Sequence, residues 1–242
     1  MKNELKSIIK KCIHFLSRKY SKYDNKLPYL ITSAVAFLIV AGATKLFIEL
    51  TENLKSDLLA RLDRNITNYV ASYRTPALDT YFVTVTNIGD ALGYLVVFIS
   101  CTVIFYLVFK NWKYVVQLAL VLLLTLCSNL LLKKVINRAR PSIEHLVAVE
   151  TLSYPSGHAM TAMAFYGFLI YLISTFKLNL FIKTGIIIIL SILIISIGIS
   201  RIYLGVHFPS DIAAGFIAGF VWVVLCILML NLLRVFREDP NT

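Results

Sequence analysis

The sequence predicts an all-α, polytopic membrane protein built as a six-transmembrane-helix bundle. Of its 242 residues, 58% are hydrophobic and only 15% are charged, whereas soluble domains are about half apolar. The charged residues come in blocks that are separated by long, uncharged apolar runs. Only helices and closed barrels satisfy their backbone hydrogen bonds inside lipid, and these runs are too long for barrel strands. Each run is therefore expected to be a spanning helix.

Residues 1–26 are expected to form a basic cytoplasmic leader, followed by one six-span domain over residues 27–242. Eight Lys or Arg lie in the leader, and the positive-inside rule assigns such a flank to the cytoplasm. The net charge of +11 thus indicates membrane orientation rather than nucleic-acid binding. Apolar residues at helical spacing favour an N-terminal basic amphipathic helix anchored at the membrane interface over a solvated leader. These residues are Ile8, Ile9, Cys12, Ile13 and Leu16.

Six apolar runs reach the roughly 17–25 residues that a spanning helix needs. They cover residues 27–44, 91–109, 114–132, 159–176, 184–200 and 212–233. Lys or Arg residues follow the second, fourth and sixth runs, which places those turns and both termini in the cytoplasm. The alternate loops are then extracytoplasmic, and one short extracytoplasmic helical segment is expected between residues 54 and 79.

The first group of chemically informative residues begins where the third run ends. Lys133 and Arg140 are seven residues apart, and Pro141 follows. Two turns of helix would place both cations on one face, where the planar arginine fork and the ammonium group could bind one phosphate. Taken alone, a basic cap on a spanning helix explains this pair better.

The second group, Pro155-Ser156-Gly157-His158, opens the fourth run. Such a helix start offers backbone N–H groups and a hydroxyl to an anion, and His158 could donate a proton to the bound group. An ordinary capped helix start is an equally good interpretation of this segment alone.

The third group consists of Ser200-Arg201, His207 and Asp211, around the loop between the last two runs. A carboxylate that accepts one ring N–H leaves the other ring nitrogen unprotonated, as a nucleophilic imidazole requires. The alternatives are an ordinary loop histidine and an aspartate that caps the last helix. All three groups fall on the same predicted membrane face, where ionisable residues are costly and by default mark function.

Together the groups resemble the type-2 phosphatidic-acid phosphatase superfamily, which includes bacterial lipid phosphatases and undecaprenyl-pyrophosphate phosphatases. Its signature KxxxxxxRP, PSGH and SRxxxxxHxxxD is complete and in order at residues 133–141, 155–158 and 200–211. The resemblance implies that His207 attacks phosphorus, that Asp211 fixes its tautomer, and that His158 protonates the leaving oxygen. It also implies that the phosphate oxygens are bound by Lys133, Arg140, Ser156, Gly157 and Arg201.

The implied function is a membrane lipid phosphatase acting through a phosphohistidine. Its substrate would be undecaprenyl pyrophosphate, phosphatidylglycerophosphate or phosphatidic acid, met at the extracytoplasmic face of the cell membrane. No metal or other cofactor is expected, because three cations supply positive charge and no carboxylates show metal-ligand spacing. A lipid-linked phosphotransferase with the same site is the first alternative, and a non-enzymatic transporter of a phosphorylated solute is the second.

The oligomeric state is open at this stage. Gly215 and Gly219 lie four residues apart on the sixth run, a small-residue spacing that brings membrane helices close together. They could join two copies of the chain, but packing within their own bundle is the favoured interpretation.

Overall fold

The computed structural model describes residues 27–148 and 152–237, and all regular secondary structure in this part of the chain is helical. The elements are α2 (Leu27–Glu52), the 3-10 turn η2 (Asn53–Lys55), α3 (Asp57–Ala71), α4 (Pro76–Ile88), α5 (Ala91–Phe109), α6 (Lys113–Ile136), α7 (Gly157–Thr175), α8 (Leu180–Tyr203) and α9 (Pro209–Arg237). The chain divides into two compact units. Residues 41–224 form the larger unit, which holds the site, whereas residues 27–40 and 225–237 belong to the smaller one. The predicted N-terminal amphipathic helix lies outside the described residues.

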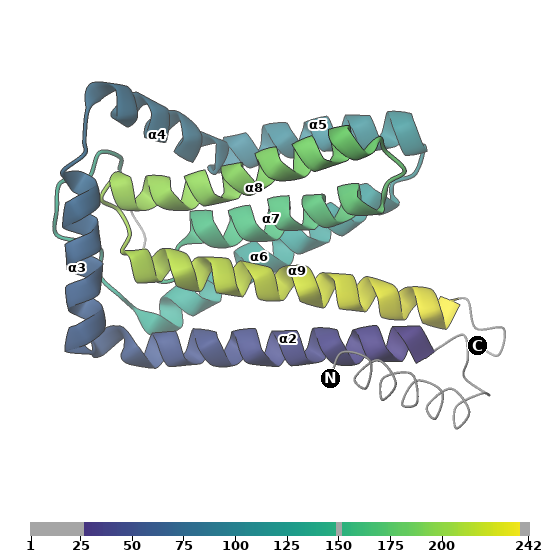
Figure 1. The fold of residues 1–242 in the computed structure, drawn as a ribbon, viewed down its shortest axis with the longest axis horizontal. Coiled ribbons are helices and arrows are strands. Elements are labelled where there is room, and N and C mark those ends of the chain that lie inside the picture. Colours follow the sequence, from purple (N-terminus) through teal and green to yellow (C-terminus); the bar gives the residue numbers. More distant parts are fainter. Residues whose placement is uncertain (1–26, 149–151, 238–242) are drawn as a thin grey trace, which may run out of the picture. The chain divides into compact units, whose positions relative to one another are not determined.

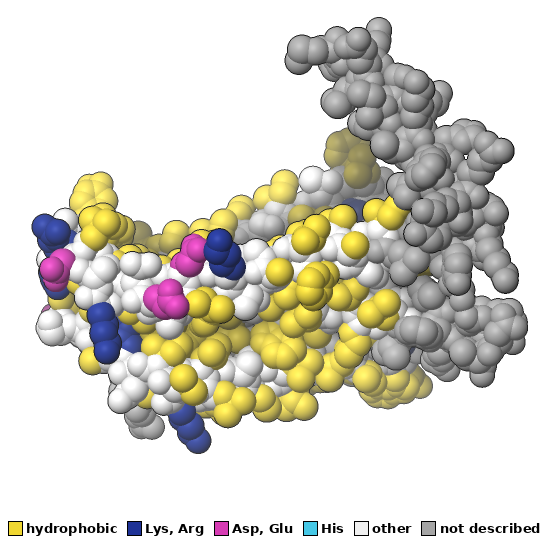
Figure 2. Space-filling model, turned by 90° about the horizontal axis from the view of Figure 1, so that it is seen from below, with side chains coloured by type: hydrophobic (Ala, Val, Ile, Leu, Met, Phe, Trp, Pro, Cys, Tyr) yellow, Lys and Arg dark blue, Asp and Glu magenta, His cyan; other side chains and the backbone are white. Residues whose placement is uncertain are grey.

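The six predicted spans are confirmed, because six described helices are long and apolar enough to cross a membrane. They are α2, α5, α6, α7, α8 and α9, and most of them extend a few residues beyond the apolar runs. Helix α2, for example, continues past Lys45, which pairs with Glu49 one turn later at 3.6 Å. On the face drawn in Figure 2, apolar side chains dominate, and charged side chains of the described residues gather mainly toward the end that holds α3.

The segment between the first two spans holds two helices instead of the single one expected over residues 54–79. Helix α3 ends at Ala71, and α4 begins at Pro76 with Thr75 as its N-cap, whose side chain accepts a hydrogen bond from the amide of Leu78. Proline suits the first helical position because it has no amide hydrogen to donate. The chain therefore turns here, and α3 crosses the end of the bundle while α4 leads toward α5 (Figure 1).

Two contacts tie this outer layer to the end of α8. The hydroxyl of Tyr203 donates to Asp79 at 2.6 Å and accepts from the amide of Thr75 at 3.1 Å. A small apolar cluster surrounds the same residue, made of Tyr203, Leu204 and Val206 with Val70, Phe82, Val83, Leu146 and Val147 packed against it. The outer layer thereby fixes the loop that leaves α8, and this loop carries His207.

Helix α7 is the central helix of the larger unit. Of its spanning residues 61% are buried, compared with 11–33% in α5, α6, α8 and α9. In Figure 1 it lies between α8 and α9, with α6 behind it. The residues that begin α7 are therefore enclosed by several helices.

Gly215 and Gly219 pack inside the bundle against α7, which confirms the favoured interpretation of their spacing. A Cβ on Gly215 would lie 2.8 Å from the carbonyl oxygen of Ser156 and 2.9 Å from Cβ of Ala159. A Cβ on Gly219 would collide with the carbonyl oxygen of Met160. The two glycines thus let the backbone of α9 approach the first turns of α7, which joins the PSGH segment to the start of α9.

Candidate active site

His207 lies in the loop between α8 and α9, and the end of α8 folds this loop back over itself. The amides of Val206 and His207 both donate to the carbonyl oxygen of Arg201, at 3.1 and 3.2 Å. Gly205 has a φ of +78°, a left-handed conformation that glycine adopts without steric cost. The turn buries His207 to 1% exposure and directs its ring toward the first turn of α9.

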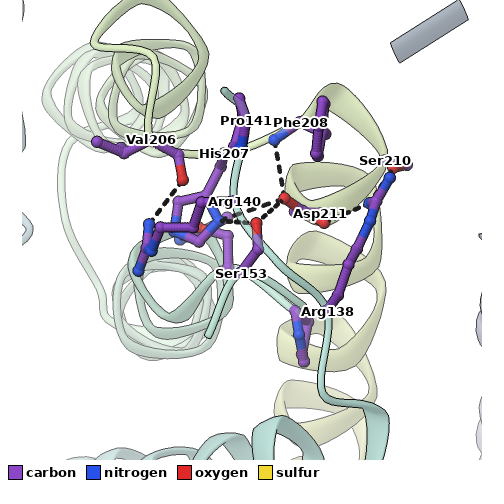
Figure 3. Close-up of polar contacts among 12 residues, drawn as sticks. Arg138, Arg140, Pro141, Ser153, Val206, His207, Phe208, Ser210 and Asp211 are labelled. Atoms are coloured by element: carbon purple, nitrogen blue, oxygen red, sulfur yellow. Dashed lines mark hydrogen bonds and ion pairs between the residues drawn. The ribbon is translucent and has the colours of Figure 1, made fainter. Parts of the chain in front are cut away.

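The contacts of the His207 ring assign its tautomer. Nη1 of Arg140 lies 3.3 Å from Nε2 of His207, and because a guanidinium can only donate, Nε2 must be the unprotonated nitrogen. Nδ1 then carries the hydrogen, and it lies 3.4 Å both from Oδ2 of Asp211 and from the hydroxyl oxygen of Ser153. Figure 3 shows the ring between these partners. This arrangement leaves the lone pair of Nε2 on the side of Arg140, as nucleophilic attack requires.

Asp211 is fully buried and has a complete set of hydrogen-bond donors. Its Oδ2 accepts from the Ser153 hydroxyl at 2.5 Å and from the amide of Phe208 at 2.8 Å, and its Oδ1 accepts from Arg138 at 2.6 Å. Hydrogen bonds and a nearby cation stabilise the charged form of a carboxylate. Asp211 is therefore held as a fixed anion behind His207.

The cations predicted from the sequence converge on one cavity of about 290 Å³. Its lining includes Lys133, Arg140, Gly157, His158, Arg201 and His207. Arg201 is 4% exposed and donates to the hydroxyl of Thr86 at 2.6 Å. Its Nε is buried without a hydrogen-bond partner among the described residues, so this guanidinium keeps a donor beyond its contact with Thr86. Such a cavity suits a phosphate group, whose oxygens accept several charge-assisted hydrogen bonds.

Lys133 and Arg140 reach this cavity by a different route from the one expected. Helix α6 ends at Ile136, and Asn137 takes a left-handed conformation with a φ of +48°. The two cations therefore do not share a helix face. Lys133 lies in the last turn of α6, whereas Arg140 is carried by the irregular segment that follows, where its Nη1 donates to the carbonyl oxygen of Val206 at 2.6 Å. The prediction of convergence was right, and its helical explanation was wrong.

The PSGH segment is fixed to both neighbouring helices. The amide of Ser156 donates to the carbonyl oxygen of Asp211 at 3.1 Å, and a Cβ on Gly157 would lie 3.0 Å from Oδ1 of Asn129. Ser156 itself is fully buried and is not part of the cavity lining, because its hydroxyl accepts from the amide of Ala159 at 3.5 Å as the N-cap of α7. Its predicted contact with phosphate therefore stays a prediction, whereas Gly157 and His158 face the cavity.

Several residues that shape the site were not singled out in the sequence. Arg138 lies between the expected cations, and its guanidinium bridges Asp211 and Asp63, the latter at 2.7 Å. Ser153 lies just before the PSGH segment, and Asp90 accepts a hydrogen bond from His158 at 2.7 Å. Arg138 and Ser153 stand close to recognised motifs, so their polarity was a usable signal. Asp63 stands apart from any motif and offered no such signal, whereas Asp90 directly precedes the apolar run of residues 91–109, and that position was a usable signal.

Burial lowers the pKa of His207 from 6.5 to about 3. A group whose pKa is lowered stays neutral as the pH falls until that value is approached, so His207 is expected to remain neutral from pH 8 to pH 5. The check is nitrogen-15 NMR of histidine-labelled protein in detergent, with a His207→Ala sample to assign the resonance. We expect the shifts of an Nδ1-protonated neutral ring throughout. A titration midpoint near 6.5 would contradict the buried geometry.

Comparisons with known proteins identify relatives of this chain in sequence and in fold. The family model described as the PAP2 superfamily matches residues 114–234. Phosphatidylglycerophosphatase B of Bacillus subtilis (strain 168) is 32% identical over 186 residues, which cover 72% of this chain and 85% of that protein.

Two crystal structures are also similar in fold. The first transmembrane PAP2-type phosphatidylglycerolphosphate phosphatase from Bacillus subtilis superposes with a TM-score of 0.73 and 25% identity over 84% of this chain and 98% of that one. LpxE from Aquifex aeolicus gives a TM-score of 0.56 and 25% identity over 69% of this chain and 94% of that one.

Proposed function

The chain belongs to the PAP2 superfamily of membrane lipid phosphatases, and from this premise we propose that it hydrolyses a phosphate monoester or pyrophosphate of a lipid through a phosphohistidine at His207. The enzyme is a multi-pass membrane hydrolase, and PAP2 enzymes are metal-independent. The observation that carries the proposal is the His207 ring, whose Nδ1 faces Asp211 while its Nε2 lies 3.3 Å from Arg140, a cation of the cavity lining.

In the first step, the lone pair of Nε2 of His207 attacks phosphorus and the bond to the leaving oxygen breaks. His158, in the first turn of α7, donates the proton that the leaving oxygen needs. Asp211 stabilises the charge that develops on the His207 ring through its contact with Nδ1. In the second step, water attacks the phosphohistidine, His158 takes up a proton from that water, and phosphate leaves.

The cations Lys133, Arg140 and Arg201, together with the PSGH turn, would hold the non-bridging oxygens in this sequence. Phosphoryl transfer depends mainly on positioning and on stabilisation of charge spread over these oxygens. Three cations around one cavity of about 290 Å³ supply that stabilisation from side chains that are already in place. Preorganised charges of this kind cost no reorganisation when the reaction occurs.

A second cavity supports a lipid as the substrate. It has a volume of about 370 Å³ and is lined mostly by apolar side chains of α5 and α6, among them Leu95, Phe98 and Leu122. It shares Asp90, Gly157 and His158 with the cationic cavity. A headgroup phosphate in the cationic cavity would therefore have apolar surface beside it for its tails.

Phosphatidylglycerophosphate is the first substrate to test, because the similar Bacillus subtilis protein is a phosphatidylglycerophosphatase. Undecaprenyl pyrophosphate and phosphatidic acid also end in a phosphoryl group, linked through an anhydride in the first and through an ester in the second, and belong in the same panel. A lipid-linked phosphotransferase is the second candidate, since a phosphohistidine can pass its phosphate to an alcohol as well as to water. We further propose that both termini are cytoplasmic and that the site faces the extracytoplasmic side.

The test is inorganic phosphate release from these three lipids in detergent micelles, with and without EDTA. We expect release from at least one lipid at a rate that EDTA leaves unchanged, because side chains provide the positive charge. Strict dependence on added Mg²⁺ would overturn the metal-independent mechanism. Product analysis in the presence of a second lipid alcohol separates the two candidates, since a transferase would form a new lipid phosphate instead of free phosphate.

A further inference from the structure

Asp90 stands directly before α5 but does not cap it. It occupies the N-cap position, where a carboxylate commonly accepts a hydrogen bond from the first helical turn, yet its side chain makes no such bond. Its Oδ1 instead accepts from Nε2 of His158 at 2.7 Å. The side chain of His158 is 20% exposed and that of Asp90 is 49% exposed, and both line the cationic cavity. The Asp90 carboxylate therefore forms its hydrogen bond with His158 and does not cap α5.

The neighbouring residue, Gly89, brings the backbone close to the same edge of the His158 ring. A Cβ on Gly89 would lie 3.2 Å from Cδ2 of His158 and 2.9 Å from Cγ2 of Ile197. Gly89 thus faces Cδ2, and Asp90 faces the adjacent ring atom Nε2. The other ring nitrogen, Nδ1, lies on the opposite edge, and the described residues show no protein partner for it. His158 is consequently held along one edge and can donate from the other.

We propose that Asp90 is a positioning residue for His158, which it orients and keeps protonated so that Nδ1–H is the donor to the leaving oxygen. This inference rests on the proposed role of His158 as the proton donor. It assigns a task to a residue outside the three sequence motifs, at the junction of α4 and α5.

The proton balance of the step is complete with these groups. Before attack, His158 is an imidazolium whose Nε2–H is bonded to Asp90. As the bond from phosphorus to the leaving oxygen breaks, the Nδ1 proton moves to that oxygen, and His158 becomes neutral while Nε2–H stays with Asp90. In the hydrolytic step, Nδ1 takes a proton from the attacking water, which restores the imidazolium.

The charge on Asp90 is what makes this arrangement effective. The hydrogen bond from His158 is the main cause that lowers the pKa of the Asp90 carboxyl, so the group is an anion when the ring is protonated. The cations Lys133, Arg140 and Arg201 in the same cavity oppose a further positive charge on His158. A fixed anion beside Nε2 offsets part of that opposition. A carboxylate in an anion-binding cavity could alternatively act only by repelling the substrate, and this alternative predicts the opposite experimental result.

The experiment compares two substrates that differ in their need for a proton. The leaving group of phosphatidic acid is the strongly basic alkoxide of diacylglycerol, whereas that of p-nitrophenyl phosphate is the weakly basic p-nitrophenolate. Asp90→Asn keeps a hydrogen-bond acceptor for Nε2–H and removes only the charge. We expect its kcat to fall about 10- to 100-fold for phosphatidic acid, within the share that acid catalysis contributes, and to change little for p-nitrophenyl phosphate. Asp90→Glu, which restores the carboxylate, should recover part of the loss.

Asp57→Asn is the matched control, because it makes the same change at an exposed carboxylate on α3 and should alter neither substrate. Equal losses of kcat on both substrates would show that Asp90 is merely structural. A lower KM or a higher kcat in Asp90→Asn would show that it only repels the substrate. Either result overturns the inference.

A parallel His158→Ala variant separates failure of this inference from failure of the proposed function. Discrimination between the two substrates by His158→Ala but not by Asp90→Asn would leave the acid role of His158 intact and remove Asp90 from it. Absence of discrimination in both variants would remove the acid role itself.

Discussion

Replacing His207 with alanine is expected to lower phosphate release by about 10⁴-fold or more, the scale seen when a covalent nucleophile is removed from other enzymes. The variant loses the only imidazole of the described cavity lining whose contacts leave Nε2 unprotonated. His158 is not expected to take its place, because its Nε2–H is bonded to Asp90 and in the proposed reaction its Nδ1 carries the proton for the leaving oxygen, so that neither ring nitrogen offers a lone pair. The three cations remain, so the KM of the lipid should change far less than kcat.

Trapping of the intermediate gives an independent measurement. Wild-type protein quenched in alkali during turnover of a phosphorus-32-labelled lipid should carry label that is stable in alkali and lost in acid, as expected of a phosphoramidate. His207→Ala should carry none. His145→Ala is the matched control, since His145 is exposed and bonds the carbonyl oxygen of Pro141 at 2.9 Å. Full labelling of the His207 variant would mean that another residue is the nucleophile.

The fold was largely predictable because the membrane imposes one simple requirement on the chain. An uncharged apolar run of sufficient length must be a helix in lipid, so six runs gave six helices without any knowledge of their packing. The outer layer follows no such rule. Its second helix begins at Thr75-Pro76, a common signal for a helix start. The prediction of a single helical segment between residues 54 and 79 did not use this signal.

The motif residues of the site were predictable from the sequence, whereas several residues that contact them were not. His158, Arg201 and Asp211 stand where apolar runs begin or end, and an ionisable group at such a position is informative by itself. His207 lies in the short loop between two of these ends. Some of the groups that orient the site come from elsewhere in the chain. Asp63 lies on an amphipathic helix among other charged residues. It reaches Ser210 only because α3 approaches the start of α9, where Asp63 accepts a hydrogen bond from the amide of Ser210 at 3.0 Å. No local sequence pattern predicts that α3 packs near the start of α9.

Arg138 is expected to contribute most to stability among the site residues that were not singled out in the sequence. Its Nη1 donates to Asp211 at 2.6 Å and to the Ser210 hydroxyl at 2.8 Å, its Nη2 donates to Asp63 at 2.7 Å, and its guanidinium lies 4.5 Å from the centre of the Phe208 ring. Its side chain is 15% exposed, and those of Asp63 and Asp211 are 2% and 0% exposed. Two buried carboxylates thus share one cation, and Figure 3 shows Arg138 beside one of them, Asp211.

Arg138→Met is therefore expected to lower the free energy of unfolding by about 3–5 kcal/mol, the usual cost of removing one partner from a buried ion pair. It should also lower kcat by on the order of 10²-fold, because Asp211 loses a donor that fixes it behind His207. Thermal unfolding in detergent and phosphate release measure the two effects. Arg61→Met is the control, since Arg61 is exposed and bonds the backbone of its own helix at 3.2 Å.

A double-mutant cycle with Asp63→Leu decides whether the two effects have one cause. If the lost stability comes from a carboxylate left without its cation, Asp63→Leu should cost less in the Arg138→Met background than in the wild type, by about 1–3 kcal/mol. The loss of kcat should persist in the double variant, because Asp211 still lacks Arg138. Additive stabilities would show that the Asp63–Arg138 contact contributes little, and recovery of kcat would show that Arg138 acts on catalysis through α3 and not through Asp211.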